Sequence, residues 1–117
     1  MKTGFLVVVS ALSVLTLTGC TTVSEGDYRL GQTALAESPS IKREIVADCV
    51  AERRRESLNE QRTYAALMNV SVANYPTTFC KRVINAVSSG RLTYADIARL
   101  NSSSADQSKI IRIIQGK

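Results

Sequence analysis

Three glutamates at helical spacing are the residues with the clearest potential for chemistry. Glu52, Glu56 and Glu60 follow one another at intervals of four, so a helix would carry them on one side. Carboxylates in this arrangement can hold a cation or transfer protons. Three arginines at 53–55 lie among them and favour surface ion pairs instead, and the chain contains no histidine, the commonest general base. We therefore predict no catalytic residue, no metal site and no small-molecule substrate.

A basic patch is the second candidate for a functional surface. The chain carries a formal net charge of +5. Such a patch could contact lipid phosphates, an anionic polysaccharide or an acidic partner. A solvated helix face, neutralised in part by nearby glutamates, is the simpler alternative. The patch would comprise Lys42, Arg43, Arg53, Arg54, Arg55 and Arg62.

The N-terminal segment has the organisation of a signal peptide. Lys2 provides a positive charge, and an apolar run follows from Phe5 to Leu17. As a helix this run would span roughly 20 Å at 1.5 Å per residue. The hydrocarbon core of a bilayer is about 30 Å thick, so the run is short for a permanent membrane span.

The end of this segment, Leu17-Thr18-Gly19-Cys20, resembles the lipobox of bacterial lipoproteins. In that family a diacylglycerol is attached to the cysteine sulfur, a signal peptidase cuts just before it, and the new amino group is often acylated. The resemblance implies that Cys20 is lipidated, and this covalent lipid is the only non-protein group we expect. Thr21 follows in place of aspartate, which by the same resemblance favours the outer membrane, with the domain facing the periplasm and the inner membrane as the alternative.

Lipidation of Cys20 would leave Cys49 and Cys80 as a pair. An oxidising envelope favours a disulfide between them. Both fall on apolar helix faces, where a bridge could join two packed helices. A loop of this length would stabilise the fold by roughly 3–4 kcal/mol in the chain-entropy description. Two reduced, buried cysteines are the alternative.

Two helices are predicted in the middle of the chain. Ser38-Pro39 can cap and begin the first one. Ser57 and Glu60 have the spacing of a capping box, so a second helix should run from Leu58 to about Met68. The apolar face of the first helix would comprise Ile41, Ile45, Val46, Cys49 and Val50.

Further helices are predicted toward the C-terminus. Residues 69–76 look like a connection, with a very short strand at Val70 and Val72 as an alternative. A third helix should begin at Thr77 or Thr78 and end before Gly90. Its buried face would comprise Phe79, Cys80, Val83, Ile84 and Val87. A cap at Thr93-Tyr94-Ala95-Asp96, a turn at 101–104 and a last helix from about Ala105 to Gly116 complete the pattern.

The last helix carries a wide isoleucine arc, which is the best candidate for an interface. An exposed apolar patch would mark a dimer or a partner surface, but a fully buried core helix is the leading explanation of this arc. The segment from Phe79 to Gln115 also has the outline of a helix-turn-helix. An envelope location argues against nucleic acid as its ligand. The arc comprises Ile110, Ile111, Ile113 and Ile114.

The sequence thus predicts a signal peptide at 1–19, a lipidated N-terminus and flexible tether at 20–37, and a helical domain at 38–117. A weak helix near Leu30–Glu37 is an alternative within the tether. The fold class is all-α, a small bundle of four or five short helices with one disulfide. The first functional hypothesis is a lipid-anchored, non-enzymatic module that binds another envelope protein or itself. A structural lipoprotein that uses its basic face on anionic lipid or polysaccharide, and an inhibitor of an envelope enzyme, are the alternatives.

Overall fold

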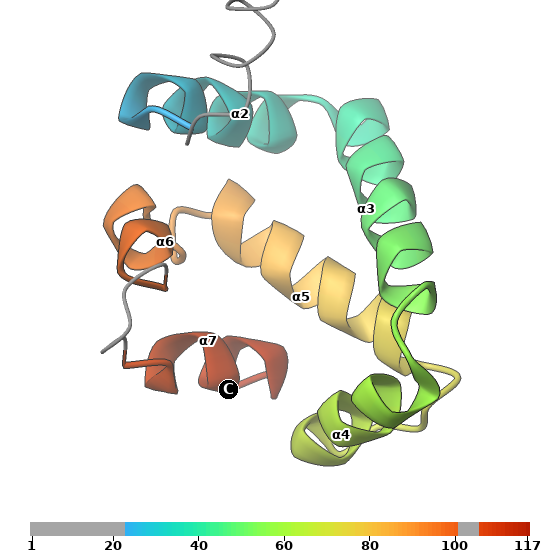
Figure 1. Cartoon of the computed structure of the whole chain (residues 1–117). Helices are drawn as coiled ribbons and strands as arrows, with labels where there is room; N and C mark the ends of the chain where they lie inside the picture. Colours follow the sequence, from blue (N-terminus) through green and yellow to red (C-terminus); the bar gives the residue numbers. More distant parts are fainter. Residues whose placement is uncertain (1–22, 101–105) are drawn as a thin grey trace, which may run out of the picture.

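The computed structural model describes residues 23–100 and 106–117, and within these ranges it is all-helical with no strand. This confirms the predicted fold class, although these residues already form six helices where four or five were expected. Helix α5 lies at the centre, with α2, α3, α4 and α7 packed around it (Figure 1). The helices are α2 (Glu25–Glu37), α3 (Pro39–Arg54), α4 (Leu58–Met68), α5 (Tyr75–Ser88), α6 (Tyr94–Leu100) and α7 (Ser108–Ile114).

The additional helix is α2, which occupies most of the segment expected to be a flexible tether. That expectation is wrong for Glu25–Glu37. Two long-range hydrogen bonds hold α2 to the end of α5 and the segment after it. The hydroxyl of Tyr28 donates to the carbonyl oxygen of Leu92 at 2.5 Å, and Nε2 of Gln32 donates to that of Val87 at 2.9 Å. Polar side chains thus fix a helix that has little apolar periodicity.

Three helix starts follow the capping signals of the sequence. Ser38 accepts from the backbone N–H of Ile41 at the start of α3, and Ser57 accepts from that of Glu60 at the start of α4. At α6, Thr93 and Asp96 bond reciprocally through side chain and backbone. Each cap satisfies backbone N–H groups that have no partner inside the helix, which is why these boundaries were predictable.

Helix α5 begins earlier than predicted, at Tyr75 rather than at Thr77 or Thr78. Asn69 ends α4 in the left-handed conformation, with a φ of 57°. A tight turn follows, in which the carbonyl oxygen of Ser71 accepts from the N–H groups of both Asn74 and Tyr75. The turn leads directly into α5 and leaves no room for the alternative strand.

Helix α7 begins at Ser108, after residues that lie outside the described range. The predicted turn at 101–104 and the predicted helix start at Ala105 fall on those residues. At the other end the chain leaves the helix at Gly116, whose φ of +77° suits glycine.

The core consists of two small clusters that α5 and α7 share. Tyr75 is fully buried in the first cluster, and Leu92 is 1% exposed in the second. Among the described residues, no helix is both long enough and apolar enough to cross a membrane. The first cluster contains Ala65, Met68, Tyr75 and Ile114, and the second contains Ala86, Leu92 and Ile113.

The apolar face predicted for α3 is only partly the face that packs. Ile41 and Ile45 are 41% and 38% exposed, so they lie outside the main contact with α5. The half-buried residues of α3 form a stripe on a different side of the helix from Ile41 and Ile45. The face of α3 that packs therefore includes two cations. This stripe comprises Lys42, Val46, Cys49, Val50 and Arg53.

Candidate functional site

A disulfide joins α3 to α5 near the middle of both helices. The sulfur atoms of Cys49 and Cys80 are 2.10 Å apart, and the Cα atoms are 5.8 Å apart. Cys80 is fully buried. The predicted pair is therefore confirmed. The lipobox residues Leu17, Thr18, Gly19 and Cys20 lie outside the described range.

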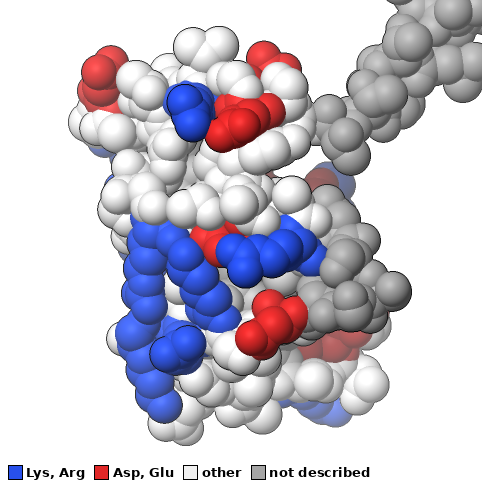
Figure 2. Space-filling model, turned by 90° about the vertical axis from the view of Figure 1, so that its left-hand side faces the viewer, with Lys and Arg blue, Asp and Glu red and all other residues white. Residues whose placement is uncertain are grey.

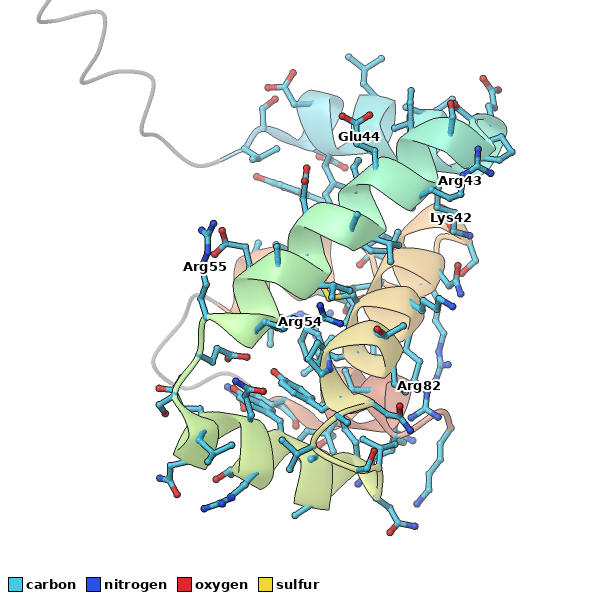
Figure 3. The ribbon with its side chains drawn as sticks, turned by 90° about the vertical axis from the view of Figure 1, so that its right-hand side faces the viewer. Lys42, Arg43, Glu44, Arg54, Arg55 and Arg82 are labelled. Carbon is cyan, nitrogen blue, oxygen red and sulfur yellow. A yellow bond between two sulfur atoms is a disulfide. The ribbon has the colours of Figure 1, made fainter. Side chains whose placement is uncertain are left out.

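Beyond the disulfide, at the C-terminal end of α3, the predicted basic patch is divided by ion pairs. Arg53 pairs with Glu56 at 3.4 Å, and its guanidinium carbon lies 5.5 Å from the centre of the Phe79 ring. Arg55 pairs with Glu52 at 3.1 Å and points away from α5 (Figure 3). These two arginines are therefore occupied by contacts within the protein.

The glutamates of the predicted row take separate structural roles. Glu52 pairs with Arg55. Glu56 pairs with Arg53 and also accepts a hydrogen bond of 2.7 Å from the hydroxyl of Tyr75. Burial raises the pKa of Tyr75 far above its usual value of 10, and the bond to Glu56 adds to this effect. The phenol therefore stays neutral and holds the end of α3 to the start of α5.

A groove lies between α3 and α5 on the other side of the disulfide. It has a volume of about 540 Å³. Its apolar lining comes from three residues of α3, and its edges are basic. The lining residues are Pro39, Lys42, Arg43, Val46, Ala47, Lys81 and Asn85.

The three cations of the groove differ from Arg53 and Arg55 at the other end of α3. Within the described residues, Lys42, Arg43 and Lys81 take part in no ion pair. In Figure 3, Lys42 and Arg43 extend to the α5 side, while the neighbouring Glu44 points away from them. The sequence placed Lys42 and Arg43 in its basic patch, but it missed Lys81 because the helix pairing that brings it close was not known.

The remaining members of the predicted patch do not line this groove. Arg54 lies lower on α3 (Figure 3), and Arg62 is exposed on α4. The six cations therefore form no single surface. Only Lys42 and Arg43 join the groove.

On the face of the molecule that Figure 2 shows, blue basic side chains gather along one side and red acidic side chains lie beside some of them. Asp96 of α6 binds Lys109 at 2.6 Å and Arg99 at 3.1 Å. The hydrogen bond from Lys109, followed by that from the backbone of Thr93, lowers the pKa of Asp96 to about 2. The Lys109 of the helix-turn-helix outline is thus already paired.

Two further arginines stabilise the C-terminal end of α7. Arg82 donates to the carbonyl oxygen of Ile114 at 2.6 Å, and Arg91 donates to that of Lys117. Cations suit this position because carbonyl groups at a helix C-terminus lack partners within the helix. These arginines serve the fold, and the sequence patterns did not indicate them.

The isoleucine arc on α7 faces the core, so its interpretation as an interface is wrong for Ile113 and Ile114. Ile113 and Ile114 are each 3% exposed, and Ile110 packs against both core clusters. Ile111 is half-buried. The leading explanation, a buried core helix, holds because α7 closes the core beneath α5 (Figure 1).

Within residues 23–100 and 106–117, no three or more His, Cys, Asp or Glu side chains come together as metal ligands would. The groove between α3 and α5 is thus the candidate site that combines an apolar lining with charges not used by the fold. Compared with known proteins, the chain matches no protein-family model, no curated protein and no solved structure.

Proposed function

We propose that this protein is a lipid-anchored envelope lipoprotein whose helical domain is a non-enzymatic interaction module. It binds another envelope protein or a second copy of itself. The observation that carries the proposal is the groove between α3 and α5, which offers an apolar lining and three cations without ion pairs in the described structure. Apolar contacts flanked by charges are the usual composition of a protein recognition surface.

The anchor in this proposal is the lipid on Cys20. One buried acyl chain gives only marginal membrane binding, because each buried methylene contributes about 0.8 kcal/mol. The two or three chains implied by the lipobox resemblance would hold the protein stably. Thr21 after the cysteine favours the outer membrane, with the inner membrane as the alternative.

The start of α2 keeps the domain close to this anchor. Ser24 caps α2 by accepting from the backbone N–H of Asp27, so only residues 21–23 separate Cys20 from the cap. Even fully extended, this link spans no more than about 14 Å between Cys20 and Ser24. The domain would therefore act at the membrane surface, in place of the long tether that the sequence suggested.

The titratable groups with the largest pKa shifts support a non-enzymatic role. Tyr75 and Asp96 are strongly shifted, as catalytic groups often are. Each is hydrogen-bonded to partners that join two elements of the fold, Glu56 for Tyr75 and Lys109 for Asp96. Both pKa shifts are therefore explained by burial and hydrogen bonds within the fold.

The lipid part of the proposal is tested by intact mass spectrometry of the membrane-extracted protein. We expect loss of residues 1–19 and the added mass of a diacylglycerol and an acyl chain. Cys20→Ser should abolish both changes and release the domain from the membrane fraction. Unchanged processing and membrane retention of this variant would contradict the anchor.

The interaction part is tested by photo-crosslinking in the bacterium that encodes the chain. A photoreactive residue at Asn85 in the groove should give a discrete crosslinked product, whose mass separates a second copy from another protein. The same residue at Arg62, exposed on α4, is the matched control. Equal products at both positions, or none at Asn85, would contradict the groove as the binding surface.

A further inference from the structure

The groove between α3 and α5 combines features that specify the chemistry of its occupant. Pro39, Val46 and Ala47 supply an apolar lining, and its volume of about 540 Å³ is in the range of ligand sites. A groove between two helices is elongated, so it suits a ligand that presents a row of apolar groups. An amphipathic helix presents such a row at intervals of three and four residues.

The edges of the groove select the charge of the occupant. Lys42 and Arg43 lie on one edge and Lys81 on the other, and no acidic residue lines the groove. Some arginines elsewhere pair with carboxylates, as at Arg29, Arg53 and Arg55, whereas no ion pair neutralises the groove cations within the described residues. The groove cations therefore complement a ligand that carries negative charge on both sides of its apolar row.

The position of the groove favours a protein segment over a lipid surface. The groove starts at Pro39, which lies beyond the C-terminal end of α2. Helix α2 has 13 residues and so separates its own start, near the anchor, from the groove by about 20 Å. In Figure 3 the blue helix α2 begins on the left, whereas Lys42 and Arg43 lie on the right.

From this arrangement we propose that the groove between α3 and α5 binds an acidic amphipathic helix of a partner protein. The apolar stripe of that helix packs against Pro39, Val46 and Ala47, and its flanking carboxylates pair with Lys42, Arg43 and Lys81. This inference rests on the proposed interaction function and specifies its partner.

The test uses the full-length mature protein in detergent micelles and two labelled helical peptides of about 14 residues, or four turns. Both peptides carry leucine at the same helical spacing, one flanked by glutamate and the other by lysine. We expect the acidic peptide to bind at least about tenfold more tightly in fluorescence anisotropy, since each ion pair contributes up to about fivefold. Added salt should weaken its binding.

Variants locate the binding site. Arg43→Glu and Lys81→Glu should each weaken binding of the acidic peptide about three- to tenfold, and Ala47→Trp should block it by filling the groove. Arg62→Glu on α4 and Ala51→Trp on α3 are the matched controls, because both positions are exposed and neither lines the groove. They should change affinity less than about twofold.

Three results would overturn the inference. Equal affinity for both peptides would show that the groove does not select an acidic ligand. An effect of Arg62→Glu as large as that of Lys81→Glu would show that the peptide does not bind in the groove. Displacement of the acidic peptide by phosphatidylglycerol vesicles, but not by phosphatidylcholine vesicles, assigns the groove to an anionic lipid surface.

The crosslinking at Asn85 separates this inference from the proposed function. If Asn85 crosslinks a protein in cells but the acidic peptide shows no preference, the interaction module stands and the acidic helix is wrong. If neither experiment gives a positive result, both proposals fall.

Discussion

The two ends of the α3–α5 pair, on either side of the Cys49–Cys80 disulfide, are built in opposite ways. At one end Arg53 pairs with Glu56, lies over Phe79 and faces the buried Tyr75. At the other end the cations have no carboxylate partner within the described residues, and the space between the helices is an open groove. One helix pair thus contains a closed end that stabilises the fold and an open end available to a partner. The following predictions test this division.

The closed end should lose the most stability when Tyr75 is truncated. Tyr75→Ala removes a fully buried ring that stacks on Tyr64, so we expect a loss of about 3–5 kcal/mol in the free energy of unfolding. Urea denaturation followed by circular dichroism measures it. The matched truncation at the open end, Lys81→Ala, should cost less than about 0.5 kcal/mol, and an equal loss at both positions would remove the contrast.

Removal of the disulfide should affect both ends together. Cys49→Ser combined with Cys80→Ser frees a loop with a sequence separation of 31 residues, which should cost roughly 3–4 kcal/mol. Reduction of the wild-type protein should give the same loss in urea denaturation. We also expect weaker binding of the acidic peptide in the reduced protein, and unchanged binding would show that the groove does not need the bridge.

High pH should weaken the closed end selectively. The pKa of Tyr75 is higher in the folded than in the unfolded protein. Its contribution to the free energy of unfolding is therefore complete below pH 10 and is lost as pH rises through the folded pKa. The loss should approach about 1.4 kcal/mol per pH unit above pH 10. Tyr28 also has a raised pKa, through burial and the nearby Asp96, so Tyr75→Phe is the reference that isolates Tyr75. A difference between wild type and Tyr75→Phe that stays constant from pH 8 to 11 would contradict this origin.

Neutralising single arginines should give the smallest effects and the sharpest contrast. Arg53→Gln loses the pair with Glu56 and the contact with Phe79, which should cost about 1 kcal/mol. Arg43→Gln should leave stability unchanged within about 0.5 kcal/mol while weakening peptide binding. Thermal denaturation measures stability, and fluorescence anisotropy measures peptide binding. A loss of stability in Arg43→Gln would show that Arg43 stabilises the fold and would contradict the contrast.

Local signals made most of the helices predictable. Ser38, Ser57 and the Thr93–Asp96 pair act through backbone groups within four residues, so their role can be inferred without the tertiary structure. Helix α2 was foreseen only as a weak helix near Leu30–Glu37: although Ser24 caps it locally, Tyr28 and Gln32 hold it through bonds to residues more than 50 positions away. No local pattern contains such a contact.

The candidate site was predictable only in part, for the same reason. The sequence identified Lys42 and Arg43 as basic, but helix periodicity assigned the packed face of α3 to Ile41 and Ile45. The actual rotation of α3 places Lys42 and Val46 toward α5, so Lys81 and Asn85 become their neighbours. For the isoleucine arc the sequence left both a buried helix and an interface open, because the amount of core that α7 covers depends on how α5 is placed.

The disulfide also closes a covalent ring that contains residues 49–80, including all of α4. A single backbone cut at any bond within this ring, for example in the arginine run at 53–55, leaves both fragments linked through sulfur. The groove residues lie outside the ring, on the two chain segments that enter and leave it. Proteolytic nicking within the ring would therefore leave the two walls of the groove joined by the disulfide.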